Sequence, residues 1–208
     1  MGGRGIGAYL YELGLGHQGR GSVVEVGSWL GSSCAYVSLG LKDAGSAAPV
    51  HCFDRFTYLG EKAELVGHLG LELNQDLVPV FQSYVLPVYS NIHAHKTDIL
   101  DIRWDGSPVE IYIDDASKKK AQFLHVLKTF GPSFIPGVTT MVLMDFNMYR
   151  KENVYAPEKI AQYRCQKDIL DSLAGHFRLV ESFWPAKSMA SFRYEKKFDF
   201  GSLNRLHS

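Results

Sequence analysis

The chain has 208 residues, 46% of them hydrophobic and 21% charged, which is ordinary for a globular α/β domain. Its 22 basic and 22 acidic residues balance, so nothing in the composition indicates binding to nucleic acid or to an anionic membrane. No apolar run approaches the roughly 20 residues of a membrane span. The three scattered cysteines lack a CxxC pair and predict reduced core thiols in a cytoplasmic protein. The sequence does not fix the oligomeric state, and a homo-oligomer is possible.

The N-terminal part of the chain predicts a helix, a strand and a second helix. Residues 8–15 predict a short helix that Gly14 and Gly16 interrupt. Residues 23–26, with the sequence Val-Val-Glu-Val, predict a buried strand, because three of the four are apolar and β-branched. A helix over residues 34–45 follows a glycine turn.

That turn is Gly27-Ser28-Trp29-Leu30-Gly31, and Ser32 or Ser33 is expected to cap the helix after it. A strand, a glycine turn and a helix N-terminus bring free backbone N–H groups and the positive end of a helix dipole to one point. The turn therefore predicts a site for an anionic or strongly polar ligand.

The middle of the chain continues the alternation. A second strand over residues 50–54 ends in an acid, and two strands joined by a helix form a parallel, right-handed βαβ unit. Residues 55–73 contain three glycines and are too long for a plain connection, which predicts a lid or a substrate-facing insertion. A helix over residues 76–85 and a weak strand over 92–97 follow, and Asp98 comes directly after that strand.

The C-terminal half predicts two further buried strands, two helices and a closing hairpin. In chain order these are a strand over 109–114, a helix over 118–130, a strand over 139–144, a helix over 157–173, and strands over 177–184 and 189–194 joined by residues 185–188. The order predicts an α/β fold with a Rossmann-like, doubly wound, mostly parallel sheet and a C-terminal antiparallel hairpin. One domain over residues 1–208 is expected, with its core over 22–195 and a loose tail after residue 200.

Several predicted strands end at a glycine or an acid. The residues at these ends are Gly27, Asp54, Asp114 and Asp145. The carboxyl ends of parallel strands share one edge of a doubly wound sheet, and ligands bind there. The sequence therefore places the functional site at this edge.

Trp29 decides between the ligands that such a turn can take. A dinucleotide fingerprint needs a glycine where Trp29 stands, and no G-K-[ST] follows for a P-loop. S-adenosylmethionine has no phosphate. Two glycines four residues apart, with Glu25 before them, suit its amino-acid end, and Asp54 can accept hydrogen bonds from both ribose hydroxyls.

The turn resembles motif I of class I S-adenosylmethionine-dependent methyltransferases, in the run Glu25-Val26-Gly27-Ser28-Trp29-Leu30-Gly31-Ser32-Ser33. It is most similar to a branch with a G-S-x-x-G-x-S turn, which includes sugar and natural-product O-methyltransferases. Later segments resemble that branch too, at Phe53-Asp54, Thr97-Asp98, Tyr112-Ile113-Asp114 and Leu143-Met144-Asp145-Phe146. The resemblance implies S-adenosylmethionine as cofactor and implies contacts from Glu25, Gly27, Ser28, Trp29, Gly31, Ser32, Asp54, Arg55, Asp98 and Asp114.

Two departures from relatives with a metal-assisted mechanism bear on the chemistry. Ala116 stands where some relatives have an acid that serves as general base, and Met144 stands where they have a potential metal ligand. Asp114 and Asp145 end central strands and are the predicted catalytic residues, as base or as metal ligand. A Mg²⁺ ion needs only one or two carboxylates, so Asp114 and Asp145 could hold Mg²⁺, but the sequence does not assign a metal site.

The sequence leaves three functions to compare. The first is S-adenosylmethionine-dependent O-methylation of a small-molecule or saccharide acceptor. Ala116 and Met144 favour the second, a non-catalytic methyltransferase-like module that binds the cofactor or assembles with a partner. The third, an NAD-dependent oxidoreductase, is disfavoured by Trp29.

Overall fold

The computed structural model of the chain describes residues 3–184 and 188–203. Its longer helices are α1 (Gly3–Leu15), α2 (Ser32–Asp43), α4 (Val78–Val85), α5 (Lys120–Phe130) and α6 (Pro157–Ser172), with a short α3 (Ala63–Val66). Its strands are β1 (Ser22–Val26), β2 (Val50–Asp54), β3 (Ile92–Lys96), β4 (Val109–Asp114), β5 (Thr140–Leu143), β6 (Phe177–Ser182) and β7 (Ala190–Tyr194). None of the described helices combines the length and apolarity needed to cross a bilayer.

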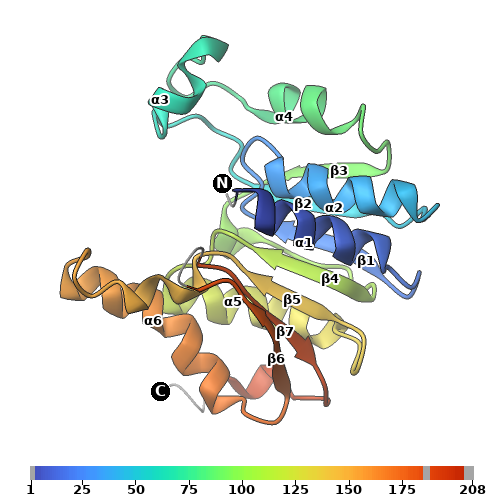
Figure 1. The fold of residues 1–208 in the computed structure, drawn as a ribbon, viewed down its shortest axis with the longest axis vertical. Coiled ribbons are helices and arrows are strands. Elements are labelled where there is room, and N and C mark those ends of the chain that lie inside the picture. The colour runs from blue at the N-terminus through green and yellow to red at the C-terminus, as the bar shows by residue number, and fades with distance from the viewer. Residues whose placement is uncertain (1–2, 185–187, 204–208) are drawn as a thin grey trace.

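The strands form one seven-stranded sheet in the order β3-β2-β1-β4-β5-β7-β6 (Figure 1). The first five strands of the chain are parallel, and β7 runs antiparallel to both β5 and β6. This confirms the predicted doubly wound sheet with a C-terminal antiparallel hairpin. The predicted turn between β6 and β7 lies partly outside the described residues, which omit 185–187.

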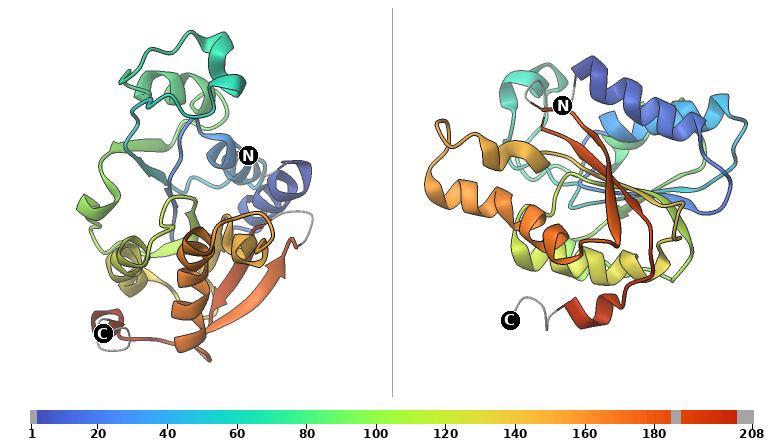
Figure 2. Two further views of the ribbon diagram at one scale, coloured as in Figure 1. Left: turned by 90° about the vertical axis from the view of Figure 1, so that its left-hand side faces the viewer. Right: turned by 60° about the horizontal axis from the view of Figure 1, so that its bottom comes forward.

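Helices cover both faces of the sheet (Figure 2). Helices α1, α2 and α4 pack on one face, and α5 and α6 pack on the other. Every residue of the central strands β1, β4 and β5 is buried, which is why their sequences are mostly apolar on both faces, with Glu25, Glu110 and Asp114 as buried acids among them. The carboxyl ends of β2, β1, β4 and β5 consequently lie side by side at one edge.

Helix α1 differs from its prediction. It begins at Gly3 and passes through Gly14 without a break. Gly14 is needed because α1 and α2 approach each other closely at this residue. A Cβ on Gly14 would lie 2.1 Å from the carbonyl oxygen of Val37, and a Cβ on Gly40 would lie 2.1 Å from that of Tyr11. The glycine therefore permits a close helix crossing, whereas its low helix propensity suggested an interruption.

The start of α2 is also different from the prediction. Its N-cap is Gly31 in the left-handed conformation, and neither Ser32 nor Ser33 supplies a side-chain cap. Ser33 instead donates its hydroxyl hydrogen bond to the carboxylate of Glu25. A buried carboxylate without a partner is costly, so the serine satisfies the acid below the turn rather than the helix end.

Candidate functional site

A cavity of about 330 Å³ opens at the carboxyl ends of the parallel strands. This volume is within the range of small-molecule sites. Its walls come from the ends of β1, β2, β3 and β4 and from the insertion after β2, with the lining residues Val26, Gly27, Trp29, Phe53, Asp54, Arg55, Thr57, Glu61, Lys62, Thr97, Asp98, Ile99, Ile102, Asp115, Ala116 and Gln122. The site thus lies at the predicted edge of the sheet, and residues of the insertion form part of its wall.

Gly27 holds the turn after β1 against the turn after β4. Its φ is +91°, in the region that favours glycine, and a Cβ there would lie 2.8 Å from the Cβ of Ala116 and 2.9 Å from its backbone nitrogen. Ala116 therefore has a packing role that its small side chain allows. The backbone approaches the cavity here with no side chain in between.

Trp29 lines the cavity and uses its backbone N–H to hold the turn. That N–H donates to Oδ2 of Asp54 at 3.0 Å, and Lys62 lies over the indole ring at 4.5 Å from its centroid. The backbone N–H of Trp29, which a pyrophosphate would need at this position, is therefore already hydrogen-bonded to Asp54. The indole Nε1 is buried and has no hydrogen-bond partner among the described residues.

Asp54 lines the cavity, and hydrogen bonds orient both of its carboxylate oxygens. Oδ2 accepts from Trp29, and Oδ1 accepts from the backbone N–H of Phe56 at 2.7 Å. Each oxygen keeps a second lone pair, so the carboxylate can still accept from two neighbouring hydroxyls. Its orientation is fixed before a ligand arrives.

Part of the cavity wall is apolar. Phe53, Ile99 and Ile102 line it together with Asp98. The carboxylate of Asp98 accepts from the backbone N–H of Leu100 at 3.0 Å and so caps the short turn Ile99–Asp101. A flat heterocycle with polar edges fits such a wall better than a charged group does.

Glu25, Ser28, Gly31 and Ser32 do not line this cavity. Glu25 is fully buried beneath the turn. Burial raises the pKa of its carboxyl to about 7, while the hydrogen bond from Ser33 and the nearby hydroxyl of Ser28 act in the opposite direction. These residues support the turn, and only Gly27 and Trp29 of the predicted motif I contacts reach the cavity wall.

Asp114 is fully buried and does not line the cavity. Its carboxylate accepts from the backbone N–H groups of Ala116 and Ser117, at 3.0 and 2.8 Å, and from the hydroxyls of Ser117 and Tyr112. It therefore shapes the turn between β4 and α5. The next residue, Asp115, lines the cavity instead.

Asp115, Lys118 and Asp145 form an ionic group beside the cavity. The ammonium of Lys118 lies 3.1 Å from Asp115 Oδ1 and 3.6 Å from Asp145 Oδ2, and Ser188 donates to Asp145 at 3.0 Å. Partial desolvation at the cavity wall raises the pKa of Asp115, whose side chain is still 43% exposed, against the effect of Lys118 and together with that of Asp145. Burial disfavours the charge on Lys118, but the carboxylates of Asp115 and Asp145 outweigh it and raise its pKa.

Asp115, Lys62 and Gln122 are lining residues that the sequence did not single out. A signal for Asp115 was present, because Ser117 follows Asp114 in the spacing of a side chain that hydrogen-bonds its own turn. That pattern assigns Asp114 to the turn and leaves Asp115 to face the site. Lys62 comes from the insertion, whose conformation has no sequence signature.

No protein-family model matches the chain, and no curated protein matches it either. Solved structures do. PaMTH1, a methyltransferase of Podospora anserina with S-adenosylhomocysteine bound, is 12% identical, with a TM-score of 0.61 over 94% of this chain and 80% of that one. The O-methyltransferase TomG of Streptomyces achromogenes, in complex with S-adenosylmethionine, is 14% identical, with a TM-score of 0.55 over 91% of this chain and 79% of that one.

CalS11, a TDP-rhamnose 3′-O-methyltransferase of calicheamicin biosynthesis, is 13% identical, with a TM-score of 0.55 over 91% of this chain and 77% of that one. At these identities the likeness concerns the fold. The strand order, the antiparallel β7 and these neighbours agree on it. The chain has the fold of the class I S-adenosylmethionine-dependent methyltransferases.

Proposed function

We propose that this chain is an S-adenosylmethionine-dependent O-methyltransferase for a small-molecule or saccharide acceptor. The observation that carries the proposal is the cavity in which Gly27, Trp29, Asp54 and Asp98 meet, from the ends of three different strands. The resemblance in sequence assigned these four residues to one ligand, and the fold belongs to structures that hold S-adenosylmethionine or S-adenosylhomocysteine. Fold alone does not give function, so the proposal rests on this site.

The cavity has a surface suited to each part of the cofactor. The exposed backbone at Gly27 faces the amino-acid end, and Asp54 accepts from the ribose hydroxyls. Phe53, Ile99 and Asp98 surround the adenine at the apolar part of the wall. When bound, S-adenosylmethionine supplies an electrophilic methyl group on a sulfonium. Glu25 and Ser33 hold the turn from below.

The acceptor side is the ionic group of Asp115, Lys118 and Asp145. A hydroxyl acceptor must lose its proton as it takes the methyl group, so a base has to lie beside it. Asp115 faces the cavity with a raised pKa, and Asp145 shares Lys118 with it. We assign the base to Asp115, the orientation of Lys118 to Asp145, and a positioning role to Asp114.

The same arrangement argues against Mg²⁺ at Asp114 and Asp145. The carboxylate of Asp114 is occupied by the hydrogen bonds of its own turn. The ammonium of Lys118 stands beside Asp145, where a cation would have to be. These residues do not fit a divalent ion, and the proposed reaction uses the charge of Lys118 in its place.

Replacing Asp54 by alanine is expected to weaken the binding of S-adenosylhomocysteine by about 1–3 kcal/mol, because the ribose hydroxyls and two backbone N–H groups lose their acceptor. Isothermal titration calorimetry on the wild type, Asp54→Ala and Asp54→Asn measures this. Asp101→Ala is the control, since Asp101 is an acid of the same region that does not line the cavity. An unchanged affinity in Asp54→Ala would reject the ribose assignment. Binding of NAD without binding of S-adenosylhomocysteine would reject the proposed function.

Asp115→Asn is expected to lower kcat by roughly 100-fold or more, the usual loss when a general base is removed. The affinity for S-adenosylhomocysteine should stay within about threefold, because Asp115 acts on the acceptor and not on the ribose or adenine. Release of S-adenosylhomocysteine on a panel of phenols, sugars and amines measures turnover. Asp171→Asn, on α6 and outside the cavity, is the control. Cofactor binding without turnover on any acceptor would support the non-catalytic module instead.

A further inference from the structure

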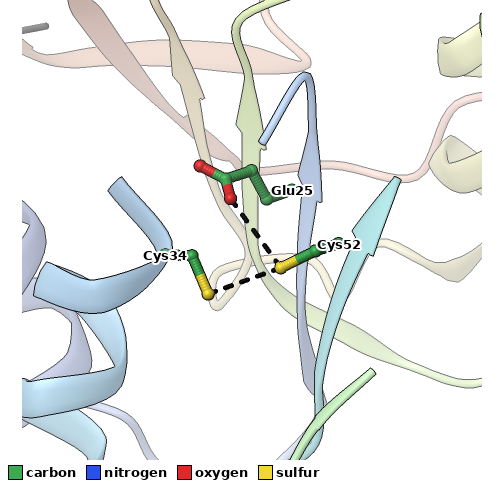
Figure 3. Close-up of side chains that lie close together, drawn as sticks. All are labelled: Glu25, Cys34 and Cys52. Atoms are coloured by element: carbon green, nitrogen blue, oxygen red, sulfur yellow. Dashed lines mark hydrogen bonds between the residues drawn. The ribbon is translucent and has the colours of Figure 1, made fainter. Parts of the chain in front are cut away.

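A second cluster of chemically active side chains lies outside the cavity, beneath the turn that follows β1. Figure 3 shows Glu25 from β1, Cys34 from α2 and Cys52 from β2 pointing toward one another. All three side chains are fully buried. None of them lines the cavity, and the proposed methyl transfer uses neither thiol.

The distances within the cluster are those of a coordination site. Cys52 Sγ lies 3.4 Å from Cys34 Sγ and 3.8 Å from Glu25 Oε2, and the three ligand atoms all lie within 4.8 Å of one another. In a tetrahedral zinc site with Zn–S of about 2.3 Å and Zn–O of about 2.1 Å, these edges are about 3.8 and 3.6 Å. The two separations that involve Cys52 differ from this geometry by less than about 0.4 Å.

The polar groups around the cluster complete it. Ser33 donates to Oε1 of Glu25, which leaves Oε2 facing the thiols. Ser28 is 4% exposed and acts on both Glu25 and Cys52, yet its hydroxyl has no hydrogen-bond partner among the residues described by the structure. An unpartnered buried hydroxyl is rare and needs an explanation, and a ligand held by its neighbours supplies one.

We propose that Glu25, Cys34 and Cys52 bind a thiophilic divalent cation of the zinc class. Two thiolates and one carboxylate select such an ion over Mg²⁺ or Ca²⁺, which prefer oxygen ligands. On binding, both thiols and the carboxyl of Glu25 give up their protons to solvent, and three ligand charges of −1 against an ion of +2 leave a net charge of −1. The N-terminal end of α2, where Cys34 lies, stabilises that remaining charge.

The position of the cluster says what the ion does. Glu25 precedes the turn 27–31 and Cys34 follows it, while Cys52 lies two residues before Asp54. One ion therefore joins β1, α2 and β2 directly below the cofactor cavity. Its role is structural, because all three ligands are fully buried and none lines the cavity, so a substrate cannot reach the ion.

Metal content tests the proposal independently of any methyl transfer. Tag-free protein is refolded with Zn²⁺ and a phosphine reductant, freed of loose metal on a desalting column, and analysed by mass spectrometry for zinc. The wild type and Cys165→Ala are expected to retain about one ion per chain, and Cys52→Ala and Cys34→Ala are expected to lose it at least tenfold. Cys165 is the matched control, being a half-buried thiol outside the cluster.

Cobalt identifies the ligands and covers the case in which a variant does not fold. With Co²⁺ in place of Zn²⁺, the wild type and Cys165→Ala should show the thiolate-to-cobalt absorption band and the visible bands of a tetrahedral ion. The row of His51, His93 and His95 is the competing site, and cobalt there would give no thiolate band. Wild-type protein without that band, or with zinc retained equally by Cys34→Ala and Cys52→Ala, would overturn the proposal.

Discussion

A methyl group at Gly27 is expected to weaken cofactor binding strongly while the protein still folds. Gly27→Ala places a side chain at φ +91°, which costs an L-residue about 1–2 kcal/mol, and brings its Cβ to 2.8 Å from that of Ala116. The turns after β1 and β4 must then move apart at the wall of the cavity. We expect the affinity for S-adenosylhomocysteine to fall by roughly 100-fold, or about 2.7 kcal/mol.

Gly45→Ala separates the two causes of that loss. Gly45 has φ +65°, but a Cβ there meets no atom within 4 Å. The variant should therefore show the backbone strain alone, as a lower melting temperature with unchanged affinity for S-adenosylhomocysteine. If Gly27→Ala bound S-adenosylhomocysteine as tightly as Gly45→Ala by calorimetry, the role of the Gly27–Ala116 contact in shaping the cavity would be refuted.

Stability is expected to fall as the pH rises from about 4.5 to about 7, because of Glu25. The pKa of this buried carboxyl is about 7 in the folded chain against 4.5 in the unfolded chain. Between these values the folded state holds a proton that the unfolded state has lost, so its stability is full at the acid end and is lost toward neutral pH. The difference of pKa corresponds to about 3 kcal/mol.

Urea titrations of wild type and Glu25→Gln at several pH values, in buffer with a chelator, measure this effect. The amide keeps the shape of the side chain and cannot ionise, so the variant should lack the decline seen in the wild type. His51 affects the pH dependence of stability with the opposite sign. Burial and its histidine neighbours lower its pKa to about 4, so its effect is to destabilise the folded protein as the pH falls. The difference between the two proteins cancels that contribution. Parallel curves for wild type and Glu25→Gln would contradict the assignment.

The parallel sheet was accessible from the sequence because its strands are buried on both faces. The run over residues 109–114, for example, has apolar side chains on both faces of the strand, at Val109, Ile111, Tyr112 and Ile113, so it lacks the alternation of a half-exposed strand. Gly14 shows the limit of such reasoning. Its sequence context is that of a helix breaker, and only the position of α2 against it reveals a contact that no side chain would allow. Close approach between elements is a tertiary fact that local propensity does not contain.

The candidate site divides in the same way. Asp54 could be predicted, because the end of a strand and the edge of the sheet fix its place. Asp114 and Asp115 could not be told apart by position at the strand end, since the turn decides which of them faces the ligand. The proximity of Cys34 and Cys52 could not be predicted either. Most of helix α2 separates them in sequence, and only the βαβ unit brings their Sγ atoms to 3.4 Å. Spacing along the chain carries little information about contacts across a crossover.

The two hydrogen bonds of Asp54 have a mechanical consequence. One comes from Trp29 in the turn after β1, and the other comes from Phe56 at the root of the insertion. Phe56 is fully buried, with φ +46°, and so forms a fixed starting point for the insertion. Any movement of residues 57–73 would therefore have to begin after Phe56. The carboxylate of Asp54 thus links the turn after β1 to the start of the insertion at Phe56. If residues 57–73 act as the lid that the sequence suggests, a ligand bound to Asp54 is expected to stiffen the point from which that lid starts.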